Sequence, residues 1–195
     1  SELGLATSAD ARQVHALRLI AALLDGGYSA RLPANLERGE ELVSGASASY
    51  DAFQRGDSLF LLSATPNVQK GKTLEQAEAG LWRELEELKK APPSAAELAR
   101  VRAQVIAGLV FERDSITSQA TSIGQLETVG LSWQLIDQEL AELEAVTPAD
   151  IQQAARRVIR PGAMGGDIIA AGEAMVKSSP NRAVLDFTAH GIGLV

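Results

Sequence analysis

The sequence predicts an α+β domain with a mostly antiparallel sheet and several helices packed on one face of it. Residues 46–51 and 58–65 are consecutive strand-like segments that can pair as a hairpin. Most of the remaining sequence carries apolar residues at helical spacing. A regular alternation of strands and helices, which would indicate a parallel sheet, is absent from the sequence.

The composition fits a single globular domain over residues 1–195, with 46% hydrophobic and 22% charged residues. A net charge of −7 and dispersed basic residues argue against a nucleic-acid partner. No apolar run approaches the roughly 18 residues of a membrane span, so we expect no membrane insertion. Cysteine is absent, which excludes a disulfide framework and a thiolate nucleophile.

The first predicted element is a helix of about fourteen residues with apolar residues at helical spacing. It follows Asp10, a favourable N-cap residue, and ends at Gly26 and Gly27. We expect residues 28–36 to form a short second helix that Pro33 breaks.

The hairpin comes next. In residues 46–51 small apolar and polar residues alternate, which is typical of a half-buried strand. The alternation places Ala46, Ala48 and Tyr50 on one face and polar residues, including Ser47 and Ser49, on the other. A turn is expected near residues 55–57, and the nearly continuous apolar run at 58–65 predicts a central strand.

Several helices should follow the hairpin. Thr73 with Gln76, and Ser94 with Glu97, have capping-box spacing before apolar stripes of helical period. Further helices are predicted over residues 115–129, 133–143 and 147–159. The Gly-rich tail, residues 162–195, contains only two short strand candidates, at 168–171 and 183–187.

No catalytic or metal-binding residue is predicted in this chain. His15 and His190 are the only histidines, and neither has a second imidazole or carboxylate at ligand spacing. We expect His15 to be a partly exposed structural residue of the first helix. The glutamates of two acidic helical segments are interpreted as solvated faces: Glu84, Glu86, Glu87, Glu139, Glu142 and Glu144.

Five segments carry a family resemblance through their order and spacing. They are DARQVHALRLIAALLDGGYSARLPANL at 10–36, Ala64-Thr65-Pro66, AAELARVR at 95–102, residues 114–115 and VTPAD at 146–150. Together they resemble one lobe of the pitrilysin/insulinase-type zinc peptidases over residues 10–161. Within the first segment, Arg31 could pair with a neighbouring carboxylate, which would give it an architectural role.

The resemblance implies a division of labour between two lobes. In this family an active lobe carries H-x-x-E-H and a distal Glu, and a related second lobe closes over the substrate. This chain has no such motif, so it resembles the second, C-terminal lobe of a longer chain or a separate subunit. Zinc is then expected in the partner lobe, and no catalytic activity is expected from this chain alone.

The partners implied by the resemblance are a zinc-bearing lobe or subunit, in a homo- or heterodimer, and a peptide substrate. An extended peptide could add to an exposed strand edge. Exported bacterial relatives imply a periplasmic location, with the cytoplasm as the alternative. An alternative function is that of a scaffold subunit, which binds partners without turnover. An autonomous hydrolase is the least favoured function.

The family's substrate-contacting residues are not matched directly. Second lobes of active members usually contribute an Arg and, seven residues later, a Tyr, and these positions hold Glu37 and Ser44 here. Arg38 stands one place away and Tyr50 lies further along the strand, so both are candidate substrate-binding residues. For Tyr50, a plain structural role in the strand is the alternative.

Overall fold

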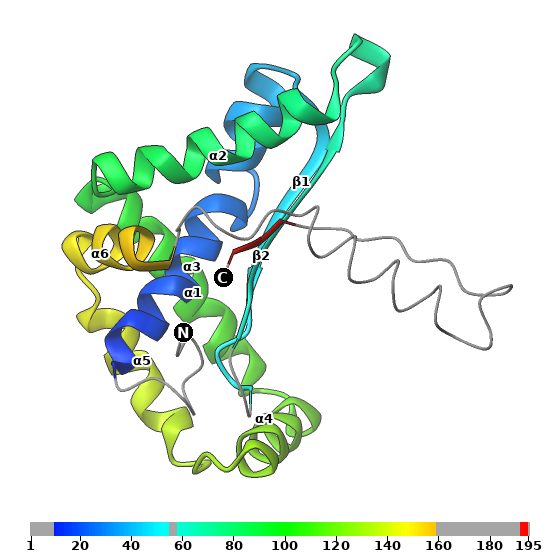
Figure 1. Cartoon of the computed structure of the whole chain (residues 1–195). Coiled ribbons are helices and arrows are strands. Elements are labelled where there is room, and N and C mark those ends of the chain that lie inside the picture. The colour runs from blue at the N-terminus through cyan, green and yellow to red at the C-terminus, as the bar shows by residue number, and fades with distance from the viewer. Residues whose placement is uncertain (1–9, 55–57, 159–191, 195) are drawn as a thin grey trace, which may run out of the picture.

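The computed structural model describes residues 10–54, 58–158 and 192–194 and has the predicted α+β architecture (Figure 1). A small antiparallel sheet lies beside a larger group of helices. In chain order the elements are α1 (Ala11–Asp25), the π-helix η1 (Leu32–Gly39), β1 (Val43–Tyr50), β2 (Phe60–Pro66), the 3-10 helix η2 (Val68–Lys70), α2 (Leu74–Lys90), α3 (Ala95–Glu112), α4 (Ile116–Val129), α5 (Leu135–Ala145), α6 (Pro148–Val158) and β3 (Ile192–Leu194).

The sheet has the order β1-β2-β3, with both pairs antiparallel. The predicted hairpin is confirmed, and Tyr50 lies opposite Phe60 in its register. β1 begins at Val43, earlier than predicted, because an irregularity between Val43 and Gly45 interrupts the alternation there. β3 was not predicted, since a three-residue strand is too short to show a period. The expected turn at 55–57 and strands at 168–171 and 183–187 lie outside the described residues.

The helix starts follow the predicted caps. Thr73 and Gln76 form a reciprocal capping box, in which the Thr73 Oγ1 accepts from the Gln76 N–H at 3.4 Å and the Gln76 Oε1 accepts from the Thr73 N–H at 3.0 Å. The Ser94 hydroxyl accepts from the Glu97 N–H at 3.1 Å. These bonds satisfy N–H groups that have no partner inside the helix.

The prediction that Pro33 breaks a helix over residues 28–36 was wrong. Pro33 lies in the first turn of η1, where its missing N–H removes no helical hydrogen bond. The helix continues to Gly39, and the Glu40 N–H donates to the Asn35 carbonyl at 2.8 Å, the five-residue spacing of a π-turn. Pro33 therefore helps to start a helix that extends to Gly39, beyond the predicted end at residue 36.

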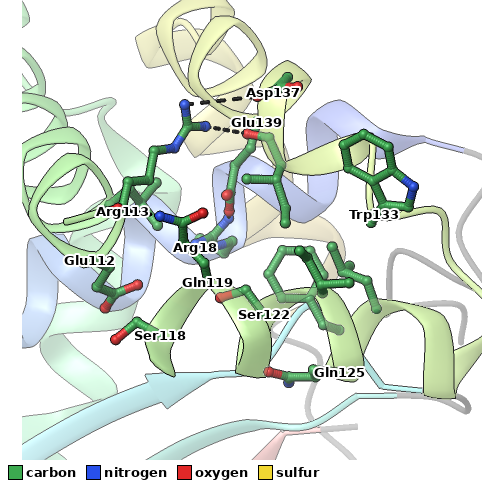
Figure 2. A pocket seen from close by; sticks show the side chains of 15 residues that line it. Arg18, Glu112, Arg113, Ser118, Gln119, Ser122, Gln125, Trp133, Asp137 and Glu139 are labelled. Carbon is green, nitrogen blue, oxygen red and sulfur yellow. Dashed lines mark hydrogen bonds and ion pairs between the residues drawn. The ribbon is translucent and has the colours of Figure 1, made fainter. Parts of the chain in front are cut away.

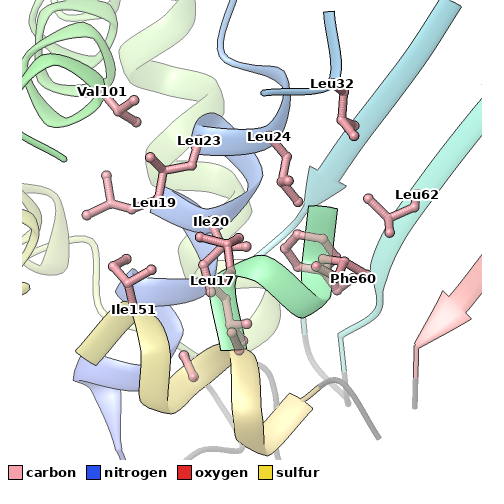
Figure 3. Close-up of a cluster of buried hydrophobic side chains, with 14 of the residues drawn as sticks. Leu17, Leu19, Ile20, Leu23, Leu24, Leu32, Phe60, Leu62, Val101 and Ile151 are labelled. Carbon is pink, nitrogen blue, oxygen red and sulfur yellow. The ribbon is translucent and has the colours of Figure 1, made fainter. Parts of the chain in front are cut away.

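The core is organised around α1, which contacts β1 on one side and α3, α5 and α6 on others. Its buried side chains include Leu17, Ile20 and Leu24, and Figure 3 shows them directed toward Phe60, Leu62 and Ile151. Because α1 is surrounded, it is apolar over most of its circumference. Within the described part of the chain, no helix has both the length and the apolar character needed to span a membrane.

Three titratable residues are more buried than predicted. One is Glu139, which was interpreted as part of a solvated face but has only 11% of its side chain exposed, because it pairs with Arg18 of α1. His15 was expected to be partly exposed, but only 3% of it is accessible because neighbouring elements enclose α1. Glu84 was interpreted as part of a solvated face, yet it is 6% exposed because it points at η1. There the Asn35 Nδ2 donates to the Glu84 Oε2 at 2.9 Å, so this buried carboxylate has a partner.

Candidate functional site

One face of the sheet is left open by the described helices. Phe60 and Leu62 point to the helical layer, and each is 2% exposed. Their neighbours Leu59 and Leu61 point the other way and are 50% and 42% exposed. Figure 1 shows α1, α2, α3, α5 and α6 lying to one side of β1 and β2, with α4 near the end of β1. We call the opposite surface the open sheet face: Ser47, Ser49, Leu59, Leu61 and Ser63.

The outer edge of β1 is closed by two carboxylates. The Ala46 N–H donates to the Glu37 Oε1 at 3.0 Å, and the Ala48 N–H donates to the Asp25 Oδ2 at 3.2 Å. Alternate residues of an edge strand direct their N–H groups away from the neighbouring strand, where an added peptide would bind them. Both donors are already used, so strand addition at these two residues requires the carboxylates to move.

Arg38 and Tyr50, the candidate substrate-binding residues, have separate surroundings. The Arg38 guanidinium lies 3.6 Å from the centroid of the exposed Tyr28 ring and donates to the Tyr28 carbonyl at 2.6 Å. The Tyr50 ring stacks on Phe60 at a centroid distance of 6.2 Å, and burial raises the pKa of its hydroxyl. These contacts explain both residues structurally, and their role as substrate contacts stays a prediction.

The residues at the family's Arg and Tyr positions also make local contacts. Glu37 binds the β1 edge, and the Ser44 hydroxyl donates to the Thr65 carbonyl at 3.4 Å. Because Glu37 carries a negative charge, it cannot make the cationic contact with substrate that the family's Arg would make at this position. The edge-closing function of Glu37 and Asp25 was missed, because neither acid has any sequence signal that links it to β1.

A zinc ion does not fit the residues that the structure describes. No three His, Asp or Glu side chains of the described ranges converge on one point. Burial, with a smaller effect of Arg18, lowers the pKa of His15 to about 4, so its imidazole is neutral at pH 7. Its Nδ1 is buried and has no hydrogen-bond partner among the described residues, which is a packing feature of α1 and not a ligand cluster.

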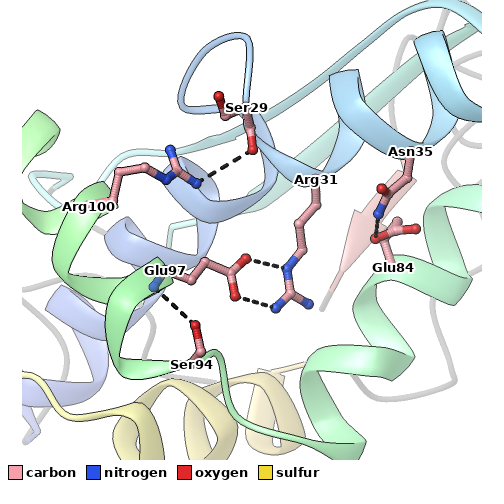
Figure 4. Close-up of polar contacts among 7 residues, drawn as sticks. All are labelled: Ser29, Arg31, Asn35, Glu84, Ser94, Glu97 and Arg100. Carbon is pink, nitrogen blue, oxygen red and sulfur yellow. Dashed lines mark hydrogen bonds and ion pairs between the residues drawn. The ribbon is translucent and has the colours of Figure 1, made fainter.

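Arg31 connects the loop after α1 to α3, as the sequence suggested (Figure 4). Its Nε and Nη2 donate to Glu97 Oε1 and Oε2, both at 2.9 Å, in a bidentate pair. The hydrogen bond to Arg31 holds the pKa of Glu97 below its ordinary value. Both side chains are about one-fifth exposed, at 20% and 24%, so solvent only partly screens the pair.

We expect Glu97→Gln to lower the free energy of unfolding by about 2 kcal/mol, because Arg31 keeps its charge and loses its carboxylate partner. Urea unfolding at pH 7 measures the change. Glu87→Gln is the matched control, since Glu87 pairs with Lys90 at 2.9 Å on an exposed face. A loss in Glu87→Gln as large as in Glu97→Gln would contradict the special role of the Arg31 pair.

Comparison with solved structures identifies the fold. The chain is similar to a protease from Helicobacter pylori with 23% identity and a TM-score of 0.67, covering 76% of this chain and 35% of that one. It is similar to a protein described as a zinc protease from Bordetella pertussis with 21% identity and a TM-score of 0.65, covering 79% and 81%. It is also similar to the inactive peptidase domain of a protein described as a zinc protease from Bordetella parapertussis, with 23% identity and a TM-score of 0.66. That match covers 77% of this chain and 76% of that one. This chain therefore spans about a third of the Helicobacter protease.

The fold is thus that of a peptidase lobe, built here without a cluster of metal ligands among the described residues. The model of the peptidase M16 inactive domain matches residues 5–105. The chain belongs to this family, which confirms the resemblance read from the sequence. A comparison with curated protein sequences gave no match.

Proposed function

We propose that this chain packs against a zinc-bearing peptidase lobe and helps to enclose and hold a peptide substrate. The open sheet face is the observation that carries the proposal. Leu59 and Leu61 are about half exposed there, next to small serine side chains. Exposed apolar side chains that lie next to one another favour contact with another protein surface. Membership of an inactive-domain family supports the expectation that zinc is bound by the partner lobe.

The closed β1 edge limits how a substrate is held. A peptide that added a strand at Ala46 and Ala48 would compete with Glu37 and Asp25 for the same N–H groups. Substrate contact through the open sheet face needs no such rearrangement. Arg38 and Tyr50 stay candidate contacts, to be tested as Arg38→Ala and Tyr50→Phe in a peptide-cleavage assay. A periplasmic location is part of the proposal, and cell fractionation tests it.

The test of the proposal is reconstitution. The chain is assayed alone and with an H-x-x-E-H lobe from the same organism, and bound zinc and cleavage of a fluorogenic peptide are measured in each sample. We expect this chain alone to show neither and the mixture to cleave faster than the zinc-bearing lobe alone. Zinc-dependent turnover by this chain alone would overturn the proposal.

A surface variant locates the contact. We expect Leu61→Arg to weaken the complex about tenfold, because a charge replaces an apolar side chain at the centre of the open sheet face. Val68→Arg is the control: Val68 is 75% exposed but lies on η2, outside that face. Analytical ultracentrifugation measures both, and equal weakening would argue against the open sheet face as the interface.

The scaffold function is the second candidate, and the closed β1 edge is the observation that favours it. A lobe that does not bind peptide at its edge can still assemble with a partner. In that case the complex forms and Leu61→Arg weakens it, but the addition of this chain leaves peptide cleavage unchanged. The reconstitution assay therefore separates the two functions.

A further inference from the structure

A pocket of about 550 Å³ lies between α4, α5, the end of α3 and α1, and none of its lining residues belongs to the open sheet face (Figure 2). Its floor is the ion pair between Arg18 of α1 and Glu139 of α5, whose side chains are 16% and 11% exposed. The Arg18 guanidinium also lies 5.3 Å from the centroid of the Phe53 ring. A volume of this size is typical of sites for small molecules or peptide side chains.

The α4 wall of this pocket is thinly packed. Leu126 is the buried residue of α4, and Ile123 on the pocket side is 40% exposed. Ser118 and Ser122 also face the pocket, one turn apart, as Figure 2 shows. Within the described part of the chain, neither serine hydroxyl has a hydrogen-bond partner. The wall therefore combines apolar surface with polar groups that can bond a ligand.

Trp133 and Glu112 lie at opposite ends of the pocket in Figure 2. Trp133 is 48% exposed and offers a ring against which an apolar or aromatic group can pack. Glu112 is exposed and has no cationic partner among the described residues. The pocket thus has an aromatic end and an acidic end.

The two arginines that line the pocket, Arg18 and Arg113, do not cancel the negative charge of its acidic end. Arg18 is paired with Glu139. Arg113 donates to the Ile136 carbonyl at 2.5 Å and lies 3.9 Å from Asp137, which is 75% exposed. Of the three carboxylates on the pocket, Glu139 and Asp137 are the partners of these two guanidinium groups, and Glu112 is left without a cationic partner among the described residues. An anionic ligand gains little here, whereas a cation at the end of the pocket away from Trp133 meets Glu112.

We propose that this pocket is a binding site for a peptide segment that carries an aromatic residue next to a basic one. The aromatic side chain packs beside Trp133, Ile123 and Leu126, and the basic side chain lies at Glu112. The Ser118 and Ser122 hydroxyls form hydrogen bonds with the peptide backbone. The ligand is inferred from this pocket alone, so the inference does not depend on a zinc-bearing partner.

Trp133 can report binding directly. The sequence contains two tryptophans, so Trp82→Phe leaves Trp133 as the single indole fluorophore. In this background the full chain is titrated with N-acetyl-Phe-Lys-amide, N-acetyl-Phe-Glu-amide and N-acetyl-Ala-Lys-amide at low ionic strength. We expect a saturable change with the Phe-Lys probe and at least about tenfold weaker binding of the other two, since charge and aromatic burial both contribute.

Two sets of variants test the position of the site. Ser122→Leu fills the pocket and should weaken Phe-Lys binding at least about tenfold, whereas Thr121→Leu, on an exposed neighbouring position, should not. Glu112→Gln should reduce the preference for Phe-Lys over Phe-Glu to about twofold or less. Glu112 is exposed, so this variant decides the case if Ser122→Leu does not fold.

Several results would overturn the proposal. They are the absence of a saturable change in Trp133 emission, equal binding of the Phe-Lys and Phe-Glu probes, or unchanged selectivity in the Glu112→Gln variant. Equal losses in Ser122→Leu and Thr121→Leu, with both variants folded, would show that the peptide binds elsewhere.

Discussion

Replacing Phe60 with alanine should lower the free energy of unfolding by about 3–5 kcal/mol, the largest effect expected of a single substitution in this chain. Phe60 is 2% exposed, lies on β2 and stacks on Tyr50. It joins the sheet to the side chains of α1, so its removal leaves a cavity between the two layers. Urea unfolding followed by circular dichroism at pH 7 measures the change.

Leu61→Ala is the matched control for Phe60→Ala. Leu61 is the next residue of the same strand but is 42% exposed on the open sheet face. We expect less than about 1 kcal/mol of destabilisation from it, because little apolar area is returned to water. A similar loss in both variants would mean that the open sheet face is also packed in solution. That result would argue against its use as an interface.

The fold was predictable where local chemistry determines the structure. Thr73 and Ser94 begin helices because their side chains accept hydrogen bonds that no backbone group can supply there. The hairpin was predictable because strand alternation and a continuous apolar run follow each other directly. Arg31 was recognised as architectural, and its partner proved to be Glu97.

The remaining features depend on tertiary contacts. Asp25 and Glu37 close the β1 edge only because the end of α1 and η1 both lie beside it. The pocket under α4 is formed by residues of several elements that are distant in the sequence, such as Arg18 and Glu139. His15 has no exposed face because helices pack on several sides of α1, which a single amphipathic pattern does not reveal.

The burial of His15 should make the protein less stable as the pH falls from 7.5 to 5. Its pKa in the folded state is about 4, against an ordinary value of 6.5, chiefly because burial disfavours the imidazolium. Between these values the unfolded chain binds a proton that the folded chain does not, so acid favours unfolding. The expected contribution is a loss of about 2 kcal/mol between pH 7.5 and pH 5.

The pH 7.5 to 5 interval lies above the range in which most carboxylates titrate, so it isolates histidine. Urea unfolding at both pH values gives the difference for the wild type and for His15→Leu, which keeps an apolar side chain at the buried position. We expect the difference to shrink by about 2 kcal/mol in His15→Leu and to persist in His190→Gln, the variant of the only other histidine. If the difference disappears in His190→Gln instead, the acid sensitivity does not come from the core of α1.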